Sequence, residues 1–320
     1  MIKSFEKDTQ SLIKNPGMGW IIYIDAFEDG MENAQRFWAA MNEPCNYAST
    51  LYIRIPWSQL EPQYQQFAWI YDENYKSLTT GARARGLKLA FRVYVDSRHS
   101  YRQATPEYVK KAGCSGYIEY DYWNPYLYDK VFQEKLGEFI KAFAEEYDDA
   151  AVTEFIDAEG VGYWGETHHI RVEHEAQYDE IYRWLVTMYS ESFKNVLLGC
   201  QYQDESFDFY LRDWAIKEKG YLMRRDSLGS PVWFQEHHKK PVRDNFINAP
   251  LFAENCYHHI VSRSNWWQED GFGTVRDMMI SVLNDALDVH ANTLDLRVCE
   301  DAQCWVKENT DLVEKFMLKG

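Results

Sequence analysis

Short apolar runs alternate with amphipathic stretches along almost the whole chain. Runs of about four to eight apolar residues, rich in β-branched and aromatic side chains, favour buried strands. Each strand is expected to end where its apolar run stops and polar residues or glycine follow. On this basis the sequence predicts eight strands, at 18–25, 49–57, 87–96, 151–157, 195–201, 220–229, 249–257 and 293–300.

Between the strands, apolar residues recur every third or fourth position, which is the pattern of a helix with one buried face. Helices are expected at 33–41, 72–84, 130–147, 173–193, 204–219, 274–289 and 307–318. The segment 232–246 fits either a short helix or a loop. The segment 97–128 predicts a long polar loop, and loops of that length in a compact domain are usually functional or act as lids.

Eight strand–helix units imply an α/β fold with a parallel sheet, and eight such units can close into a (β/α)8 TIM barrel. We expect a single barrel domain over residues 1–320, since no Pro/Gly/Ser-rich linker divides the chain. The main alternative is a doubly wound open sheet. That fold favours a glycine-rich nucleotide loop after the first strand, and neither G-x-G-x-x-G nor a P-loop is present.

The amino-acid composition limits the classes of molecule that the protein is expected to bind. The formal charge is −16, which argues against nucleic acid and against an anionic membrane surface. No apolar run approaches the length of a membrane span, and the first ten residues show no apolar segment of a signal peptide. Twelve Trp and 23 Tyr suit the flat, partly polar faces of a carbohydrate. We therefore expect a carbohydrate partner; the oligomeric state and the compartment stay open.

One stretch concentrates residues with chemical function. It is AVTEFIDAEGVGYWGETHH (151–169), which begins as a strand and then meets three glycines that suit tight turns. Its acids, imidazoles and rings are typical of a ligand site. A glutamate of this stretch is a candidate proton donor, either Glu159 at the strand end or Glu166 beside Trp164, whose apolar ring would raise the carboxyl pKa. The alternative role of either acid is to fix backbone N–H groups of the turn.

A second glutamate ends the seventh predicted strand. Glu254 follows the apolar run PLFA, so it is expected at the barrel mouth rather than in solvent. Two carboxylates across a cleft are what glycoside cleavage requires: one protonates the leaving oxygen, and the other attacks the anomeric carbon or activates water. The alternative for Glu254 is an ion pair with Arg224 or Arg225 on the neighbouring strand.

Other polar and aromatic residues lie at the predicted strand ends or in the loops that follow them. In a TIM barrel these positions face the site, so they are expected to bind substrate. They are Trp20, Arg54, Trp57, Arg92, Tyr94, Asp157, Trp164, His168, Arg225, Asp226, His258 and Trp266. Metal-dependent barrels typically carry H-x-H on the first strand, which here has no histidine. The absence of C-x-x-C also speaks against structural zinc, so we expect neither metal nor cofactor.

The stretch LYIRIPWSQLEPQ, followed by FAWIYDENYKSLTTGARARGLKLAFRVYVD, resembles the second and third βα units of clan A glycoside hydrolases. It is similar to family 42 β-galactosidase-like barrels. The stretch VGYWGETHH resembles a W-G-E-x-H signature in a set of little-characterised barrel glycosidases, and YLMRRDSLG and PLFAENCYHH look like the sixth and seventh strands of that set.

The resemblance implies a retaining glycoside hydrolase with the acid/base after the fourth strand and the nucleophile at the end of the seventh. These roles correspond to Glu166, with Glu159 as the alternative, and to Glu254. Clan A usually places Asn before the acid/base, whereas Ala158 and Gly165 stand there in this chain. A β-linked galactoside is the expected substrate. The alternatives are a catalytically silent carbohydrate-binding barrel and a metal-dependent hydrolase.

Overall fold

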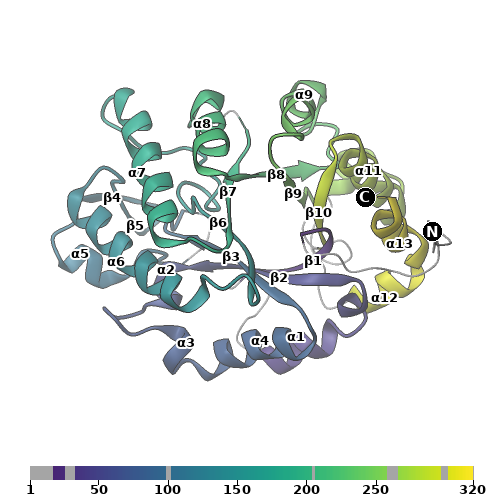
Figure 1. Ribbon diagram of the computed structural model, residues 1–320, viewed down its shortest axis with the longest axis horizontal. Helices are drawn as coiled ribbons and strands as arrows, with labels where there is room; N and C mark the ends of the chain where they lie inside the picture. The colour runs from purple at the N-terminus through teal and green to yellow at the C-terminus, as the bar shows by residue number, and fades with distance from the viewer. Residues whose placement is uncertain are drawn as a thin grey trace, which may run out of the picture.

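The computed structural model describes residues 17–25, 33–98, 102–203, 206–257, 266–296 and 302–319. Eight parallel strands close into a barrel in the order β1-β2-β3-β6-β7-β8-β9-β10, ringed by helices (Figure 1). The strands are β1 (Gly19–Asp25), β2 (Ala48–Pro56), β3 (Lys88–Tyr94), β6 (Thr153–Asp157), β7 (Leu197–Gln201), β8 (Leu222–Leu228), β9 (Leu251–Asn255) and β10 (Ala291–Leu296). The predicted barrel and all eight predicted strands are therefore confirmed.

Amphipathic helices form the outer layer. The longer ones are α4 (Glu73–Ala84), α6 (Lys130–Tyr147), α7 (Ala176–Ser192), α8 (Phe209–Lys219), α9 (Glu236–Asn245), α11 (Val275–Asp288) and α13 (Thr310–Lys319). The shorter ones are α1 (Ala34–Ala40), the 3-10 turn Pro44–Asn46, α2 (Trp57–Leu60), α3 (Ala68–Tyr71), α5 (Glu107–Lys111), α10 (Trp266–Glu269) and α12 (Ala302–Glu308). The ambiguous segment 232–246 thus contains a helix, and the predicted last helix is divided between α12 and α13.

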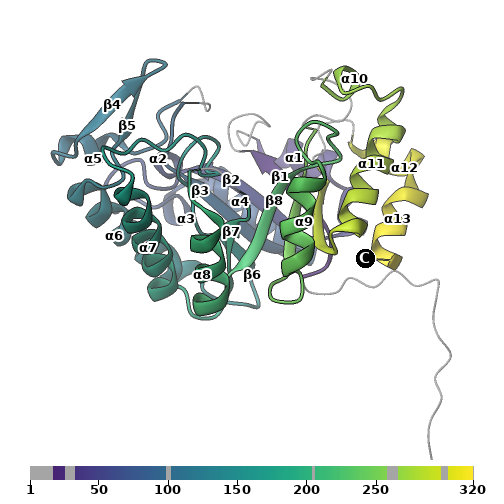
Figure 2. The ribbon, with the colours of Figure 1, turned by 90° about the horizontal axis from the view of Figure 1, so that it is seen from above.

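The segment between β3 and α6 is not a plain loop, as 97–128 was predicted to be. It contains α5 and a two-stranded antiparallel hairpin, β4 (Gly116–Glu119) and β5 (Tyr122–Pro125). The prediction failed because Tyr120 and Asp121 form the hairpin turn with positive φ. Glycine is the residue that indicates such a turn in a sequence, and neither position is glycine. The hairpin stands on the same side of the barrel as α10 (Figure 2). Both elements follow carboxyl ends of strands, so this side is the mouth.

The barrel interior changes from apolar to charged along its axis. A cluster of apolar side chains fills the lower part, consisting of Ile21, Tyr23, Tyr52, Ala90, Phe155, Leu222 and Phe252. Because alternate residues of a strand point inward, the inward positions two residues further along place Arg54, Arg92, Asp157, Arg224 and Glu254 above this plug. A charged layer therefore sits directly beneath the mouth.

Candidate active site at the barrel mouth

Arg92 is the centre of the charged layer. This residue of β3 is fully buried and contacts three carboxylates. Its Nε donates to Asp157 Oδ2 at 2.7 Å, its Nη2 donates to Glu254 Oε1 at 2.5 Å, and its Nη1 donates to Glu166 Oε1. One guanidinium thus links the two glutamates that the sequence nominated from opposite sides of the barrel.

Arg224 supports the same group from β8. Its guanidinium contacts Glu254 Oε1 and donates to the Phe252 carbonyl at 2.7 Å, while its Nε lies 3.4 Å from Asp157 Oδ2. Gly199 on β7 allows this reach, since a Cβ there would lie 3.0 Å from Arg224 Cγ. The ion pair between Glu254 and Arg224, considered as the structural alternative, is present. It coexists with the contact to Arg92.

Glu166 reaches the barrel axis through a tightly folded loop after β6. Gly160 and Gly165 lie directly on β3; a Cβ at Gly160 would sit 1.9 Å from the Val93 carbonyl oxygen, and one at Gly165 would sit 2.9 Å from Tyr94 Cβ. Trp164 and Thr167 have positive φ, which costs each of them free energy as non-glycine residues. This packing onto β3 brings the Glu166 carboxylate to Arg92.

The surroundings of Glu166 favour its ionised form. Burial raises its pKa, but the Arg92 guanidinium and then His168 oppose this, and the net effect is a pKa well below the usual range. His168 Nε2 lies 3.6 Å from Glu166 Oε2. Asp226, on β8, behaves in the opposite way. Burial above all, and then the charge of Glu166, raise its pKa even though Arg225 contacts its Oδ1.

Glu159 belongs to a different environment. Its carboxylate accepts from Arg212 Nη1 of α8 at 2.6 Å and from the backbone N–H of Gln201 at 2.9 Å, and it is 1% exposed. Arg212 is also fully buried, so this is an ion pair between the barrel and the helix layer. The structure does not bring Glu159 to Arg92, and the geometry favours Glu166 over Glu159 as the partner of Glu254.

The remaining nominated residues divide into two groups. Near the charged layer, Arg54 pairs with Asp25 at 3.1 Å, and its guanidinium lies over the Tyr94 ring, 5.5 Å from the centroid. The Trp164 ring is 36% exposed and meets the His168 ring edge-on at 5.5 Å. A cavity of about 340 Å³ opens beside His168, Arg225 and Asp226. The structure thus brings these residues together with Glu166 at the mouth.

Two tryptophans were placed wrongly as substrate contacts. Trp20 is fully buried, donates its indole N–H to the Val313 carbonyl at 2.8 Å and packs on Phe316 of α13. Trp57 is also fully buried, donates to Glu61 Oε2 at 2.9 Å and packs on Phe139 of α6. Both rings fill the layer between barrel and helices. Trp20 is the second residue of β1 and so lies at the amino end of that strand, whereas Trp57 follows β2 but points to the helices.

Two nominated residues follow β9. His258 lies outside the described residues. Trp266 begins α10 and is 57% exposed. Its exposure agrees with a role in a surface platform, which stays a prediction.

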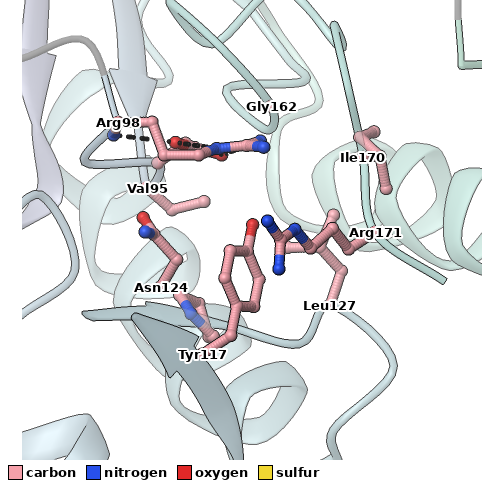
Figure 3. Close-up of a pocket in the computed structure, with 10 residues that line it drawn as sticks. Val95, Arg98, Tyr117, Asn124, Leu127, Gly162, Ile170 and Arg171 are labelled. Carbon is pink, nitrogen blue, oxygen red and sulfur yellow. Dashed lines mark hydrogen bonds and ion pairs between the residues drawn. The ribbon is translucent and has the colours of Figure 1, made fainter. Parts of the chain in front are cut away.

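Two further hollows lie next to each other beside the mouth, under the β4–β5 hairpin. Figure 3 shows the Tyr117 hydroxyl pointing into the space between the guanidinium groups of Arg98 and Arg171. Arg98 is held by Asp96 and lies 3.9 Å from the centroid of the Tyr163 ring. The adjoining open hollow, about 540 Å³, is lined by Arg98, Arg171 and Tyr163 among others. The loop that carries Glu166 is thereby braced from outside by arginine–aromatic packing.

One group in the described part of the chain has the composition of a metal site. Glu166, His168 and Asp226 each offer one ligand atom, and these atoms lie within 4.8 Å of one another. Both carboxylates already face a guanidinium, Arg92 in one case and Arg225 in the other. A cation would therefore sit beside two fixed positive charges, which disfavours metal binding there.

Comparison with known proteins shows the fold. No family model and no curated protein sequence matches the chain. Among solved structures, the catalytic domain of β-amylase from Paenibacillus polymyxa superposes with a TM-score of 0.58 at 8% identity, covering 90% of this chain and 93% of that one. Endo-glycoceramidase II from Rhodococcus sp. gives 0.57 at 11% identity, covering 97% and 80%.

A third similar structure is the exo-β-1,4-mannosidase Op5Man5 from Opitutaceae bacterium strain TAV5, with a TM-score of 0.55 at 13% identity. The match covers 93% of this chain and 55% of that longer one. At such identities the likeness demonstrates a shared barrel and no more. No helix among the described residues is both long enough and apolar enough to cross a membrane.

Proposed function

We propose that the protein is a retaining glycoside hydrolase acting on a β-linked glycoside, with a β-galactoside as the first substrate to test. The observation that carries the proposal is the contact of Glu166 and Glu254 with a single guanidinium, that of Arg92. The same barrel is found in a β-amylase, a glycoceramidase and a mannosidase, which supports the proposal at the level of fold.

In the first step Glu254 attacks the anomeric carbon, and the bond to the leaving oxygen breaks as that oxygen takes a proton from Glu166. In the second step Glu166 removes a proton from water, the water oxygen attacks the anomeric carbon, and Glu254 is released. Arg92 and Arg224 contact the attacking carboxylate and orient it. This double displacement retains the configuration at the anomeric carbon.

The spacing of the carboxylates supports retention. Two oxygens bound to the two terminal nitrogens of one guanidinium are separated by no more than about 7 Å, the width of that group plus two hydrogen bonds. Retaining enzymes need roughly 5–5.5 Å between their carboxyl groups, whereas inverting enzymes need roughly 6.5–9.5 Å to admit a water molecule. The bound of about 7 Å accommodates the retaining spacing and excludes the larger inverting separations.

The two steps of the mechanism require different protonation states of the acid/base residue. The ionised form of Glu166, favoured by Arg92, suits the second step, in which this residue acts as a base. The first step needs a proton. Asp226 is the neighbouring acid whose pKa burial raises, and it lines the cavity beside His168. Asp226 is accordingly the second candidate for the proton donor.

Labelling with a 2,4-dinitrophenyl 2-deoxy-2-fluoro-β-glycoside tests the proposal directly. The electron-poor sugar slows the second step, so a covalent adduct should accumulate on the peptide that contains Glu254 and be visible in the protein mass. Glu254→Gln should not be labelled. The matched control is Glu154→Gln, which changes a buried glutamate at the other end of the barrel, paired with Lys88 at 2.9 Å, and should still be labelled.

Binding without hydrolysis is the second candidate function. It is favoured by the burial of Glu254, which is 0% exposed and held by two arginines. Saturable sugar binding, with no turnover of 4-nitrophenyl β-galactoside, glucoside, mannoside or xyloside and no fluoro-sugar adduct, would establish this candidate in place of the hydrolase.

A further inference from the structure

Gln201 is a buried amide whose polar atoms have no partner. It ends β7 and is fully buried. Neither its side-chain Nε2 nor its Oε1 has a hydrogen-bond partner within the described part of the chain. An unpaired buried donor or acceptor destabilises a fold, so such groups are rare and call for an explanation. Here one side chain carries both.

The strand pattern places this amide at the mouth, on the inner side of the barrel. Gly199 faces the interior, because a Cβ there would meet Leu222 Cδ1 at 2.8 Å and Arg224 Cγ at 3.0 Å. Cys200 faces the helix layer, and Gln201 therefore faces inward again. It pairs in register with Arg224, and Gly199, two residues before it, pairs with Asp157. Gln201 is therefore level with the guanidinium-bearing strand position that also supports Glu254.

Local packing does not require an amide at this position. The backbone N–H of Gln201 already satisfies Glu159, at 2.9 Å from Oε2. A nearby glutamine shows what a structural amide looks like: Gln203 donates to the Glu166 carbonyl at 3.2 Å and accepts from Arg225 Nη1 at 2.9 Å. The Gln201 side chain has no comparable partners in the described structure.

We propose that Gln201 binds the sugar ring of the substrate through two neighbouring hydroxyl groups. One amide presents a donor and an acceptor side by side, and a vicinal diol complements both at once. Gln201 pairs in register with Arg224, whose guanidinium contacts Glu254 Oε1, so a sugar that reaches Glu254 enters the neighbourhood of this amide. This inference rests on the proposed function and names a residue that sets its sugar specificity.

The test is Gln201→Met, which keeps the length of the side chain and removes both polar atoms. The variant should unfold at a temperature roughly 2–4 °C higher than the parent, because an unsatisfied polar pair is lost. Its kcat/KM for the best 4-nitrophenyl glycoside should fall roughly 10-fold. The matched control Gln203→Met removes a satisfied amide from the same edge and should unfold at a lower temperature.

Deoxy substrates identify the contact. Removing one hydroxyl from the best 4-nitrophenyl glycoside should lower kcat/KM of the parent enzyme at two adjacent ring positions, and those two losses should disappear in Gln201→Met. An active variant with unchanged kcat/KM and a lowered unfolding temperature would overturn the inference, since the amide would then serve the fold through internal water.

Measurements of binding and of hydrolysis distinguish a failure of the proposed function from a failure of this inference. If the parent protein hydrolyses nothing but binds the free sugar, and Gln201→Met weakens that binding about 10-fold, the inference stands and the hydrolase proposal falls. If the parent hydrolyses a glycoside and Gln201→Met hydrolyses it equally well, the hydrolase stands and the inference falls. If the parent binds none of the four sugars, both fall.

Discussion

Replacing Arg92 with methionine should strongly destabilise the protein, by an amount that depends on pH. Arg92 contacts three buried carboxylates, but they do not depend on it equally. Asp157 and Glu254 keep Arg224 when Arg92 is removed, whereas Glu166 is left, among the described residues, with His168 at 3.6 Å and the charge of Arg54. The substitution thus leaves one poorly compensated buried carboxylate. Breaking a buried pair in this way costs about 3–5 kcal/mol, a large fraction of a typical stability of roughly 5–15 kcal/mol.

The pH dependence follows from the direction of the pKa of Glu166. In the parent, Arg92 holds this pKa below that of the unfolded chain. Glu166 therefore contributes stability above the unfolded pKa of about 4.3, and loses that contribution as the pH falls towards its folded pKa. Without Arg92, His168 and Arg54 remain to oppose the effect of burial, so the pKa of Glu166 is higher than in the parent. The carboxyl then destabilises the variant at high pH and takes up a proton as the pH falls, so the difference between variant and parent should shrink.

Urea unfolding followed by tryptophan fluorescence, at pH 8, 7, 6 and 5, measures this difference. Arg92→Lys keeps one charge but not the fork that reaches several carboxylates, so it should lie between parent and Arg92→Met. Arg243→Met is the surface control. That guanidinium contacts Asp288 at 3.0 Å and also Glu236 at the protein surface, so the expected loss of stability is small. An Arg92→Met variant within about 1 kcal/mol of the parent at pH 7, or a difference that widens as the pH falls, would refute the reasoning.

Three further predictions concern the acids and the metal. Glu159→Ala should lose about 3–5 kcal/mol of stability, since it strands Arg212, yet its folded fraction should keep the specific activity of the parent to within a few-fold; an inactive but folded variant would return Glu159 to the catalytic site. Asp226→Asn and Glu166→Gln should be compared on 4-nitrophenyl and methyl glycosides: the variant that lacks the proton donor loses roughly 10²–10⁴-fold on the methyl glycoside and much less on the activated one. Dialysis against EDTA should leave hydrolysis unchanged, and a loss restored by Zn²⁺ or Mn²⁺ would instead assign Glu166, His168 and Asp226 to a metal.

The barrel could be predicted from the sequence because each of its strands and long helices has a recognisable pattern within its own short stretch of chain. Each strand is an apolar run and each long helix an amphipathic one, and eight repeats leave few alternatives to a closed barrel. The β4–β5 hairpin was missed since each of its strands has only four residues and shows no sustained apolar run, with Ile118 69% exposed. Trp20 and Trp57 were misplaced for different reasons. Trp20 is the second residue of β1 and lies at the amino end of that strand, away from the mouth. Trp57 follows β2 directly, but whether its ring faces the axis or the helices depends on register, which local pattern does not determine.

The sequence alone does not decide between Glu159 and Glu166 as the partner of Glu254. Both acids belong to one short stretch, and strand geometry alone favours the nearer one. What separates them is which arginine each meets: Arg212, 53 positions further along the chain, or Arg92, 74 positions before. The first pairing fixes a helix to the barrel, and the second places a carboxylate opposite Glu254. The glycines that determine this outcome were visible in the sequence as turn formers, but their role is to let the loop lie on β3, and only the folded chain supplies that surface.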